Sequence, residues 1–534
     1  MTTNVGRRAS GRDVTELREL ADGLGARWLK AARSRTTAGR ERAVLRLFGV
    51  DGLDRDGRPL AAEVVDRYLA AGRDRLPGGI ALPFAVALLE YDVPPQRLAL
   101  DAASGAVDLG LEAQLLSRRD RRAAAAAEAN RLIAAALERI DANRTARSEL
   151  LDLLGDAARP WVATSLDEPS ANEAAEEART LARDGADVLQ VDVPAGRELI
   201  RHLGERGVDV PRWQPRERGQ VAAPSADQVP AGSQRGLAGL RHAIDGAAAA
   251  RGAYIRLLST PPPLASPEAA VVAAFERIDL VDADPVAEIV TAGVDPERAI
   301  ADHVAAAAVH RRAGTAVILG AGPLTVAPDL AAGMPADPAT RAGRGVALQL
   351  AAAALLRATG LPSDAIFVGA LPAWLADEPD AVARGVAEVT LRRALLPEHP
   401  LAFVEPEDDE SALAWPFMLA ALLPAAPAGG LILRRRPPGS FAATAASTRA
   451  AFSVSIGLAD ALPGRQLAGP AADHRARAIV AARDTLERLG SEGWEWLVGT
   501  AGEHGRGGLG RDAVARMRAG TDFLSKAFDP AAAA

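Results

Sequence analysis

The stretch that decides the fold runs from Arg251 to Gly322. It reads RGAYIRLLST, then PPPLASPEAAVVAAFERIDLVDADP, then a helical pattern, then AGTAVILGAG. Three short runs of β-type residues alternate here with Ala-rich helical patterns: Tyr254–Ser259, Ile278–Asp282 and Thr315–Leu319. Each run is apolar on consecutive residues, which is typical of a parallel strand buried on both faces. The stretch therefore predicts a parallel α/β architecture, whose chemistry lies where the strands end and the βα loops begin.

The same alternation extends on both sides of this stretch. Further candidate strands are Trp161–Thr164, Val188–Val193, Ile366–Gly369, Leu401–Val404 and Leu431–Leu433. Helical patterns separate them, as at Glu168–Asp184, Gly236–Ala250, Arg341–Thr359 and Asp380–Leu396. Eight strands alternating with helices predict a (β/α)₈ barrel of the TIM type. A doubly wound open sheet stays an alternative, because a strand count from sequence is soft.

The remainder of the chain reads as helical. Helical patterns occupy Asp13–Arg33, the segment after Thr36-Thr37, Ala61–Ala71, Gly78–Glu90, Arg118–Leu154 and Ala471–Gly490. We therefore expect an N-terminal helical region (residues 1–155), a barrel (156–440) and a C-terminal helical extension (441–534).

Composition excludes several functions. The 534 residues carry a net charge of −7 and no cysteine. The charge gives no support to nucleic-acid binding, and the lack of cysteine excludes disulfides, thiolate metal sites and a cysteine nucleophile. The only lysines are Lys30 and Lys526, both outside the predicted strands. A Schiff-base lysine inside the barrel is therefore excluded.

Two segments bear on location. The N-terminus MTTNVGRRASGRD has no apolar core of a signal peptide. The uncharged run Ala412–Leu433 is long enough to cross a bilayer. Prolines and a Gly429-Gly430 pair break it, so we expect a buried helix, turn and strand instead. A cytoplasmic protein without membrane attachment is expected.

Other features give weaker signals. Gly204–Arg235 is long and irregular, and a lid, a partner surface and disorder all stay open for it. His303 and His310 lie seven residues apart on a predicted helix, but no third ligand has supporting spacing. We therefore expect no metal site, and a solvated or capping role for both histidines.

Polar residues at the predicted strand ends are the candidates for catalysis. They are Asp192, Asp282, Asp284 and Glu405, and together they predict a carboxylate cluster at the barrel mouth. For each acid the alternative is a helix N-cap, and this alternative is strong for Asp284, which precedes Pro285. Gly320, in the GAGPLT turn after a strand, is a weak candidate for phosphate binding.

Several segments resemble the large (α) subunit of D-lysine 5,6-aminomutase. They are RTTAGRERAVLRLFGVDGLD (Arg35–Asp54), ARDGADVLQV (Ala182–Val191), ARGAYIRL (Ala250–Leu257), PEAAVVAAFERIDL (Pro267–Leu280), RAIADH (Arg298–His303) and GRGGLGRDAV (Gly505–Val514). The order and spacing of these segments are together fairly specific, and the resemblance extends over nearly the whole chain.

The resemblance implies a fold, cofactors and a partner. Such subunits are (β/α)₈ barrels with helical additions, and they belong to an adenosylcobalamin- and pyridoxal-phosphate-dependent enzyme. The resemblance further implies a hetero-oligomer, in which a smaller partner subunit binds cobalamin and carries the Schiff-base lysine. Candidate cofactor-binding positions are Gly196, Gln234, Ser259 and Gly320, and Asp284 is the one polar position that still matches.

The chain departs from the family where pyridoxal phosphate is held. The phosphate-binding stretch after the second strand reads Val193–Glu198 and retains only its glycine, Gly196. The segments after the third, fifth, sixth and seventh strands have also lost their tyrosine, acids, histidine and lysine. They now read Ser259–Pro263, Ile318–Leu324, Gly369–Ala373 and Glu405–Asp408. Because a phosphate needs donors or positive charge, pyridoxal phosphate is a doubtful cofactor here.

Two functions follow from these patterns. The first is an aminomutase-like α subunit that performs a 1,2-amino shift with adenosylcobalamin on a partner. The second is a catalytically degenerate paralogue, a barrel scaffold for a cobalamin-binding subunit. A cobalamin-dependent isomerase that no longer uses pyridoxal phosphate lies between them.

Overall fold

The structure is a computed structural model of the chain. It describes residues 11–52, 59–70, 72–166, 171–192, 234–261, 263–291, 293–320, 337–370, 381–404, 430–434, 470–500 and 511–528. Three of the sequence predictions lie outside these residues: Gly196, Glu405 and nearly all of the irregular segment after the second barrel strand. The predicted helix and turn of Ala412–Leu433 also lie outside them, whereas its strand is described.

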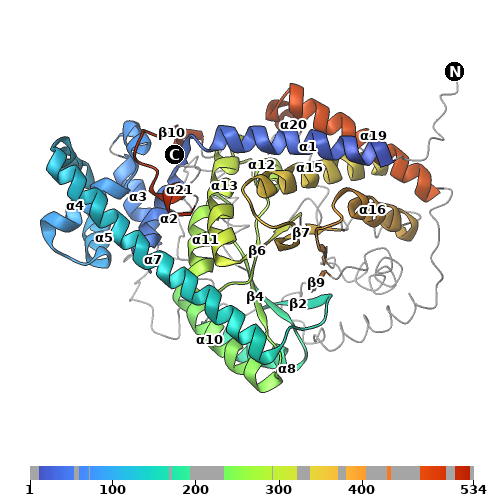
Figure 1. Cartoon of the computed structure of the whole chain (residues 1–534), viewed down its shortest axis with the longest axis horizontal. Helices are drawn as coiled ribbons and strands as arrows, with labels where there is room; N and C mark the ends of the chain where they lie inside the picture. Colours follow the sequence, from blue (N-terminus) through green and yellow to red (C-terminus); the bar gives the residue numbers. More distant parts are fainter. Residues whose placement is uncertain are drawn as a thin grey trace, which may run out of the picture.

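Eight parallel strands close into a barrel, which confirms the predicted fold (Figure 1). Each strand pairs with the next along the chain, and the last pairs with the first. The strands are β2 (Trp161–Leu166), β3 (Val188–Asp192), β4 (Arg256–Thr260), β5 (Leu280–Asp282), β6 (Ala316–Leu319), β7 (Ile366–Gly369), β8 (Leu401–Val404) and β9 (Leu431–Arg434).

Side-chain alternation along these strands separates two cores. Leu258, Leu280 and Ile318 belong to a small apolar cluster inside the barrel. Their neighbours Leu257 and Val281 belong to a larger cluster formed with the surrounding helices. Because successive strand residues point to opposite faces, this parity also tells which residues near the strand ends face the barrel axis.

Helices cover the outside of the barrel. They are α8 (Ala171–Arg183), α10 (Gln234–Arg251), α11 (Ser266–Phe275), α12 (Pro285–Thr291), α13 (Pro296–Ala313), α15 (Pro338–Ala358) and α16 (Ala381–Leu395), with a short turn η5 (Ser363–Ala365) before β7. Asp295 begins α13 by accepting hydrogen bonds from the backbone N–H groups of Glu297 (3.1 Å) and Arg298 (3.2 Å). Asp337 begins α15 in the same way, and each cap precedes a proline at the first helical position.

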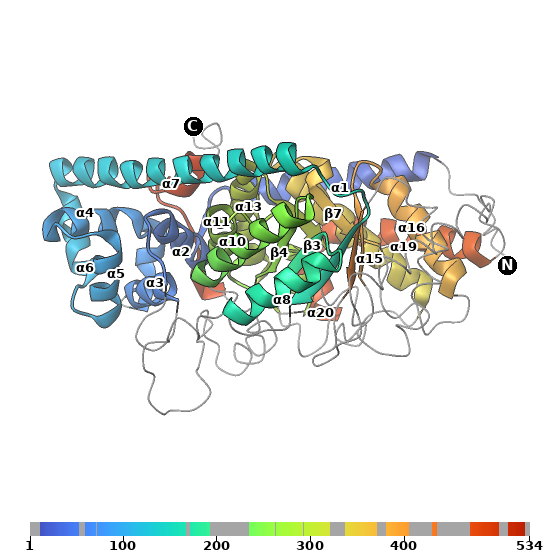
Figure 2. The same ribbon diagram turned by 90° about the horizontal axis from the view of Figure 1, so that it is seen from below.

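The N-terminal helices form a layer beside the barrel. They are α2 (Ala38–Leu47), α3 (Leu60–Ala70), α4 (Ala81–Tyr91), α5 (Pro95–Ser104), α6 (Leu109–Glu112) and α7 (Arg119–Leu154), with turns η1 (Arg73–Gly78) and η2 (Ala113–Ser117). Figure 2 shows α7 running from this layer along the barrel. Its Ile133 and Ile140 share a core with Val271 of α11 and Val309 of α13.

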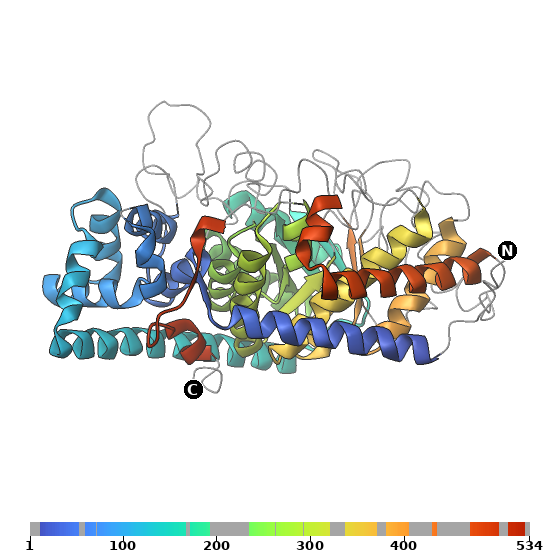
Figure 3. The ribbon, with the colours of Figure 1, turned by 90° about the horizontal axis from the view of Figure 1, so that it is seen from above.

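The first helix, α1 (Gly11–Ala32), lies on the barrel beside α19 (Pro470–Ser491), as Figure 3 shows. α1 also packs closely against α15, and Gly25 makes this approach possible. A Cβ on Gly25 would lie 2.7 Å from the backbone of Ala354 in α15, so only glycine fits. Leu17 and Leu24 of α1 share one core with Ile479 of α19 and with the barrel helices.

Two short segments far apart in the sequence pair in a two-stranded ribbon. β1 (Arg35–Thr37) pairs antiparallel with β10 (Val514–Arg516). The remaining elements near the C-terminus are α20 (Trp494–Thr500), η9 (Arg511–Ala513) and α21 (Phe523–Phe528). Among the described helices, none has the length and the low charge that crossing a bilayer requires.

Candidate functional site

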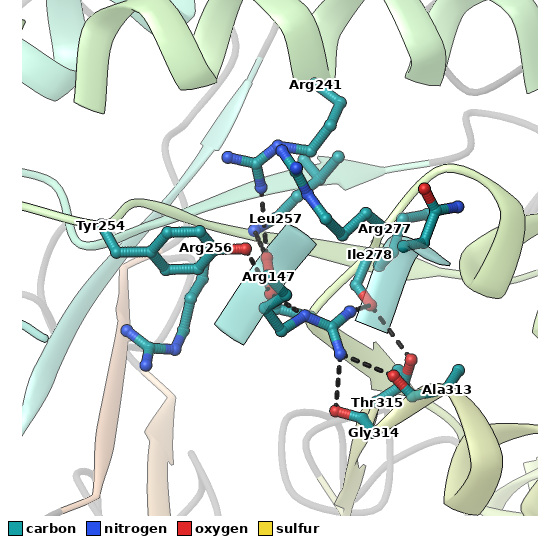
Figure 4. Close-up of polar contacts among 12 residues, drawn as sticks. Arg147, Arg241, Tyr254, Arg256, Leu257, Arg277, Ile278, Ala313, Gly314 and Thr315 are labelled. Atoms are coloured by element: carbon teal, nitrogen blue, oxygen red, sulfur yellow. Dashed lines mark hydrogen bonds and ion pairs between the residues drawn. The ribbon is translucent and has the colours of Figure 1, made fainter. Parts of the chain in front are cut away.

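A buried carboxylate, Asp279, lies at the amino-terminal end of the barrel strands. Figure 4 shows Arg147, Arg241 and Tyr254 converging there. Asp279 accepts hydrogen bonds from Tyr254 Oη (2.8 Å) and the Leu257 backbone N–H (2.9 Å). It also pairs with Arg147 (2.8 Å) and Arg241 (3.2 Å). β4 and β5 begin two residues later than predicted, at Arg256 and Leu280. Tyr254 and Ile278, the predicted first residues, precede the paired part of the strands.

Arg147 makes the same end rigid from outside the barrel. It projects from α7 and donates to the backbone carbonyls of Ile278 (2.9 Å), Ala313 (2.7 Å) and Gly314 (2.9 Å). Through these hydrogen bonds Arg147 connects the end of α13 with the segments that precede β5 and β6. In barrels of this type the ligand site lies at the opposite, carboxyl end of the strands.

Four inward-facing residues form a polar arc at the carboxyl end. They are Ser165 of β2, Gln190 of β3, Thr260 of β4 and Asp282 of β5, each two positions beyond a residue that faces the barrel axis. Ser165 and Gln190 are register partners, and Gln190 Nε2 donates to Thr260 Oγ1 at 3.1 Å. Ser165 and Gln190 are buried, whereas Thr260 and Asp282 are partly exposed. The arc can bind a polar group through hydrogen bonds and one carboxylate.

Of this arc, only Asp282 is a candidate from the sequence. Gln190 lies within a predicted strand, between the apolar Leu189 and Val191, and Thr260 lies one residue beyond the predicted strand Tyr254–Ser259. The signal that finds them is strand parity, because both share their face with residues of the barrel interior. Asp192, the last residue of β3, pairs in register with Thr260 at the same level.

Asp284 has the capping role that the sequence offers as its alternative. It is buried, and its Oδ1 accepts from the backbone N–H groups of Val286 (2.8 Å) and Ala287 (3.2 Å) at the start of α12. Burial raises the pKa of Asp284, although hydrogen bonds from Ala287, Val286 and the Gly320 backbone oppose this rise. Asp284 thus joins the ends of β5 and β6 and has little capacity left for a ligand.

Gly320 is engaged on two sides. Its backbone N–H serves Asp284, and its φ of +72° suits glycine. A Cβ at this position would overlap Gln349 Nε2 of α15, which donates to the Gly369 carbonyl at 3.0 Å. Arg392 of α16 fixes this glutamine by donating to its Oε1 at 3.0 Å. The glycine is therefore explained by helix packing rather than by a phosphate.

Two predicted cofactor positions lie away from the arc. Ser259 has the parity of Leu257 and so faces the helices, where it is buried. Gln234, at the start of α10, donates to Glu276 Oε1 (3.0 Å) and accepts from Arg46 (3.4 Å), which belongs to the N-terminal helices. The structure therefore does not bring Ser259 and Gln234 together with Asp282.

The predicted solvated or capping role of the two histidines is wrong. His303 and His310 are both 2% exposed and lie inside the helical layer. Burial lowers the pKa of His310 to about 3, so it is neutral. Within the part of the chain that the structure describes, no group of three His, Cys, Asp or Glu residues is placed to hold a metal ion.

The described part of the mouth does not fit the phosphate of pyridoxal phosphate. The last residues of β2 to β8 include no lysine or arginine, and only β9 ends in one, Arg434. Gly320 has neither a spare N–H nor open space, and Asp282 adds a carboxylate. A phosphate is best held by positive charge, whereas the last residues of β2 to β8 bring two carboxylates, Asp192 and Asp282, and no cation.

Comparison with known proteins identifies relatives. The sequence model of the family described as "D-Lysine 5,6-aminomutase TIM-barrel domain of alpha subunit" matches residues 9–410. The lysine 5,6-aminomutase alpha subunit of Fusobacterium nucleatum is 25% identical over 404 residues, which are 74% of this chain and 70% of that protein. The alpha subunit of Acetoanaerobium sticklandii is 29% identical over 287 residues, 53% of this chain and 51% of that protein.

Solved structures show weaker likenesses. Dihydropteroate synthase from Anaplasma phagocytophilum aligns with 56% of this chain and 100% of its own, at 12% identity and a TM-score of 0.36. For 3-dehydroquinate dehydratase from Geobacillus kaustophilus the corresponding values are 56%, 93%, 15% and 0.31. At these TM-scores the likenesses do not bear on function.

Proposed function

This chain belongs to the D-lysine 5,6-aminomutase alpha-subunit family, and we propose on that basis that it is the barrel subunit of an aminomutase-type complex. In this proposal the polar arc of Ser165, Gln190, Thr260 and Asp282 binds a small ammonium-bearing substrate. The complex would be a cytoplasmic hetero-oligomer with a smaller cobalamin-binding subunit.

The observation that supports the proposal is the position of the arc. It occupies four neighbouring strands at the carboxyl end of the barrel, the end that holds the ligand in barrels of this type. The Asp282 carboxylate is a suitable partner for an ammonium group, and charge-assisted hydrogen bonds of this kind are the stronger ones. Ser165, Gln190 and Thr260 add neutral groups that can orient the rest of a substrate.

Of the two cofactors of the family, the proposal gives a role to adenosylcobalamin and none to pyridoxal phosphate. Adenosylcobalamin, bound by the partner, would supply the radical chemistry, while this chain positions the substrate and excludes water. Pyridoxal phosphate does not fit the described mouth, and we assign it no step. The proposal therefore favours a cobalamin-dependent isomerase in which the substrate amine is held by Asp282 directly.

Calorimetric titration tests the arc. D-Lysine is titrated into the wild-type chain, co-expressed with its partner, and into Asp282→Asn. We expect the substitution to weaken binding by about tenfold or more, since a hydrogen bond to a charged group contributes about 1.5–3 kcal/mol. Asp141→Asn, which removes an exposed carboxylate paired with Arg312, is the control. Equal affinities of wild type and Asp282→Asn would contradict the proposal.

The second candidate is a scaffold without chemistry. It is favoured by Gly320 and Asp284, which are committed to packing and capping. Titration of the same complex with pyridoxal phosphate, read by absorbance and heat, separates the possibilities. Saturable micromolar binding with a Schiff base on the partner would restore the usual aminomutase. A stable cobalamin-loaded complex that binds neither lysine nor pyridoxal phosphate would establish the scaffold.

A further inference from the structure

Two buried side chains and one nearly buried carboxylate, from three consecutive helices, meet behind the barrel mouth. Ser266 of α11 donates to Glu288 Oε1 of α12 at 2.9 Å. His303 of α13 places its Nε2 3.0 Å from the same Glu288 oxygen and 3.3 Å from Ser266 Oγ. Ser266 and His303 are each 2% exposed. Through this triangle, side chains of all three helices are joined by hydrogen bonds.

The charges around His303 are mostly negative. Glu288 and Asp284 face it from α12, and Asp302 adjoins it on α13. Ser266 is the polar group from α11, and the other ionisable groups of α13 here are neutral His310 and Arg298, which is paired with Asp302 at 2.5 Å. Burial lowers the pKa of His303, but the three carboxyl groups outweigh burial and raise it above its ordinary value.

The triangle is connected to the ends of two barrel strands, β5 and β6, through the Asp284 cap. Ser266 begins α11, which follows the loop after β4. Glu288 lies in the first turns of α12, directly after the Asp284 cap. Asp284 in turn receives the backbone N–H of Gly320 at the end of β6. Movement of α12 would therefore shift the ends of β5 and β6 together.

We infer that His303 is a positioning residue of the barrel mouth. In its protonated form it holds Glu288 and Ser266, and so fixes the first turn of α12, the Asp284 cap and the Gly320 turn. Loss of the proton removes the ionic part of this hold and lets the first turn of α12 open. The mouth is thus held more firmly at low pH and loosens as the pH rises.

The sign of the effect follows from linkage. A histidine whose pKa is raised by folding stabilises the folded arrangement fully below its ordinary pKa, about 6.5. This contribution is lost as the pH rises through the raised value. We therefore expect opening of α12 to increase on the alkaline side of pH 6.5.

Hydrogen–deuterium exchange of the full-length chain between pH 6.5 and 9 tests the inference. The readout is the protection factor, corrected for intrinsic exchange, of the peptide containing Val286 and Ala287. We expect protection to fall with rising pH in the wild type, because the proton that holds Glu288 is lost as the pH passes the raised pKa of His303. In His303→Gln we expect protection that is already low and independent of pH.

Two further variants complete the experiment. His310→Gln is the matched control, because it removes a buried but neutral histidine from the same helix; it is expected to keep the wild-type pH profile. Glu288→Gln removes the main carboxylate partner and is expected to move the transition to lower pH, which covers the case that His303→Gln does not fold.

An unchanged pH profile in both His303→Gln and Glu288→Gln would overturn the inference. So would a loss of protection spread evenly over α13 and the barrel strands, which would make His303 a core residue only. The inference rests on the proposed function for the identity of the mouth as the site. Since exchange is measured without a ligand, its failure is distinguishable from a failure of lysine binding.

Discussion

Individual carboxylates at the two ends of the barrel have different uses. Asp279 gathers two arginines and a tyrosine at the amino-terminal end, and Asp284 caps a helix at the carboxyl end. Asp282 is a partly exposed carboxylate of the described mouth, and by strand parity it faces the barrel axis. The residue type alone does not separate these roles, because each depends on strand parity and on the helix that follows.

Gly320 offers a direct test of packing at the mouth. We predict that Gly320→Ala destabilises the chain by about 2–4 kcal/mol, since it combines a left-handed backbone with overlap against Gln349. The matched control is Gly252→Ala, which has φ +74° but no atom within 4 Å of the new Cβ, and should lose only about 1 kcal/mol.

Chemical denaturation of both variants and of Gly320→Ala/Gln349→Ala gives the measurement. Removing the glutamine should recover part of the loss, so the double variant should be more stable than additivity predicts. Equal losses of unfolding free energy in Gly320→Ala and Gly252→Ala would contradict the prediction. They would show that the Gln349 side chain moves away from the new Cβ at no cost in stability.

At the scale of elements, most of the barrel can be predicted from the sequence. Its strands are short apolar runs separated by helical patterns, and all eight lie within two residues of expectation. β1 and β10 cannot be found this way, because RTT and VAR lack an apolar run and their pairing joins distant segments. Of the site, Asp282 is visible as an acid at a strand end, whereas Gln190 and Thr260 need the interior face to be known.

Arg147 connects α7 to the barrel, and we predict that Arg147→Met lowers the free energy of unfolding by about 3 kcal/mol. The substitution leaves Asp279 with one arginine fewer and three carbonyls without their donor. Arg131→Met, on the exposed face of the same helix, should change stability by less than about 1 kcal/mol.

Urea unfolding of the two variants measures the difference. Exchange protection near the C-terminal end of α7 should fall in Arg147→Met alone. Comparable stability of both variants would mean that α7 is held by its apolar face and not by this arginine.

At the scale of the whole molecule, the helical additions complete the barrel. α1 and α19 share a core with barrel helix α15, and α2, α7 and α21 share another with α11 and α13. The predicted division into residues 1–155, 156–440 and 441–534 stays a prediction. From the shared cores we propose that the three parts form one folding unit.

The barrel segment expressed alone tests this proposal. We predict that residues 156–440 do not fold cooperatively, because the apolar faces of α11, α13 and α15 would be exposed. The fragment should bind a hydrophobic dye and lack a sharp thermal transition, whereas the full chain should unfold in one. A soluble fragment with a sharp transition would establish the barrel as an independent domain.

The ribbon of β1 and β10 has a consequence for synthesis on the ribosome. Arg40, just after β1, donates to Asp522, a residue that lies 482 positions later in the chain. At about 5–20 residues per second, the second strand emerges roughly 25–95 s after the first. During that interval β1 is an unpaired edge, and the surface that α21 will cover is open. A nascent chain of this protein therefore needs shielding until translation is nearly finished, and a ribosome stalled late leaves an aggregation-prone product.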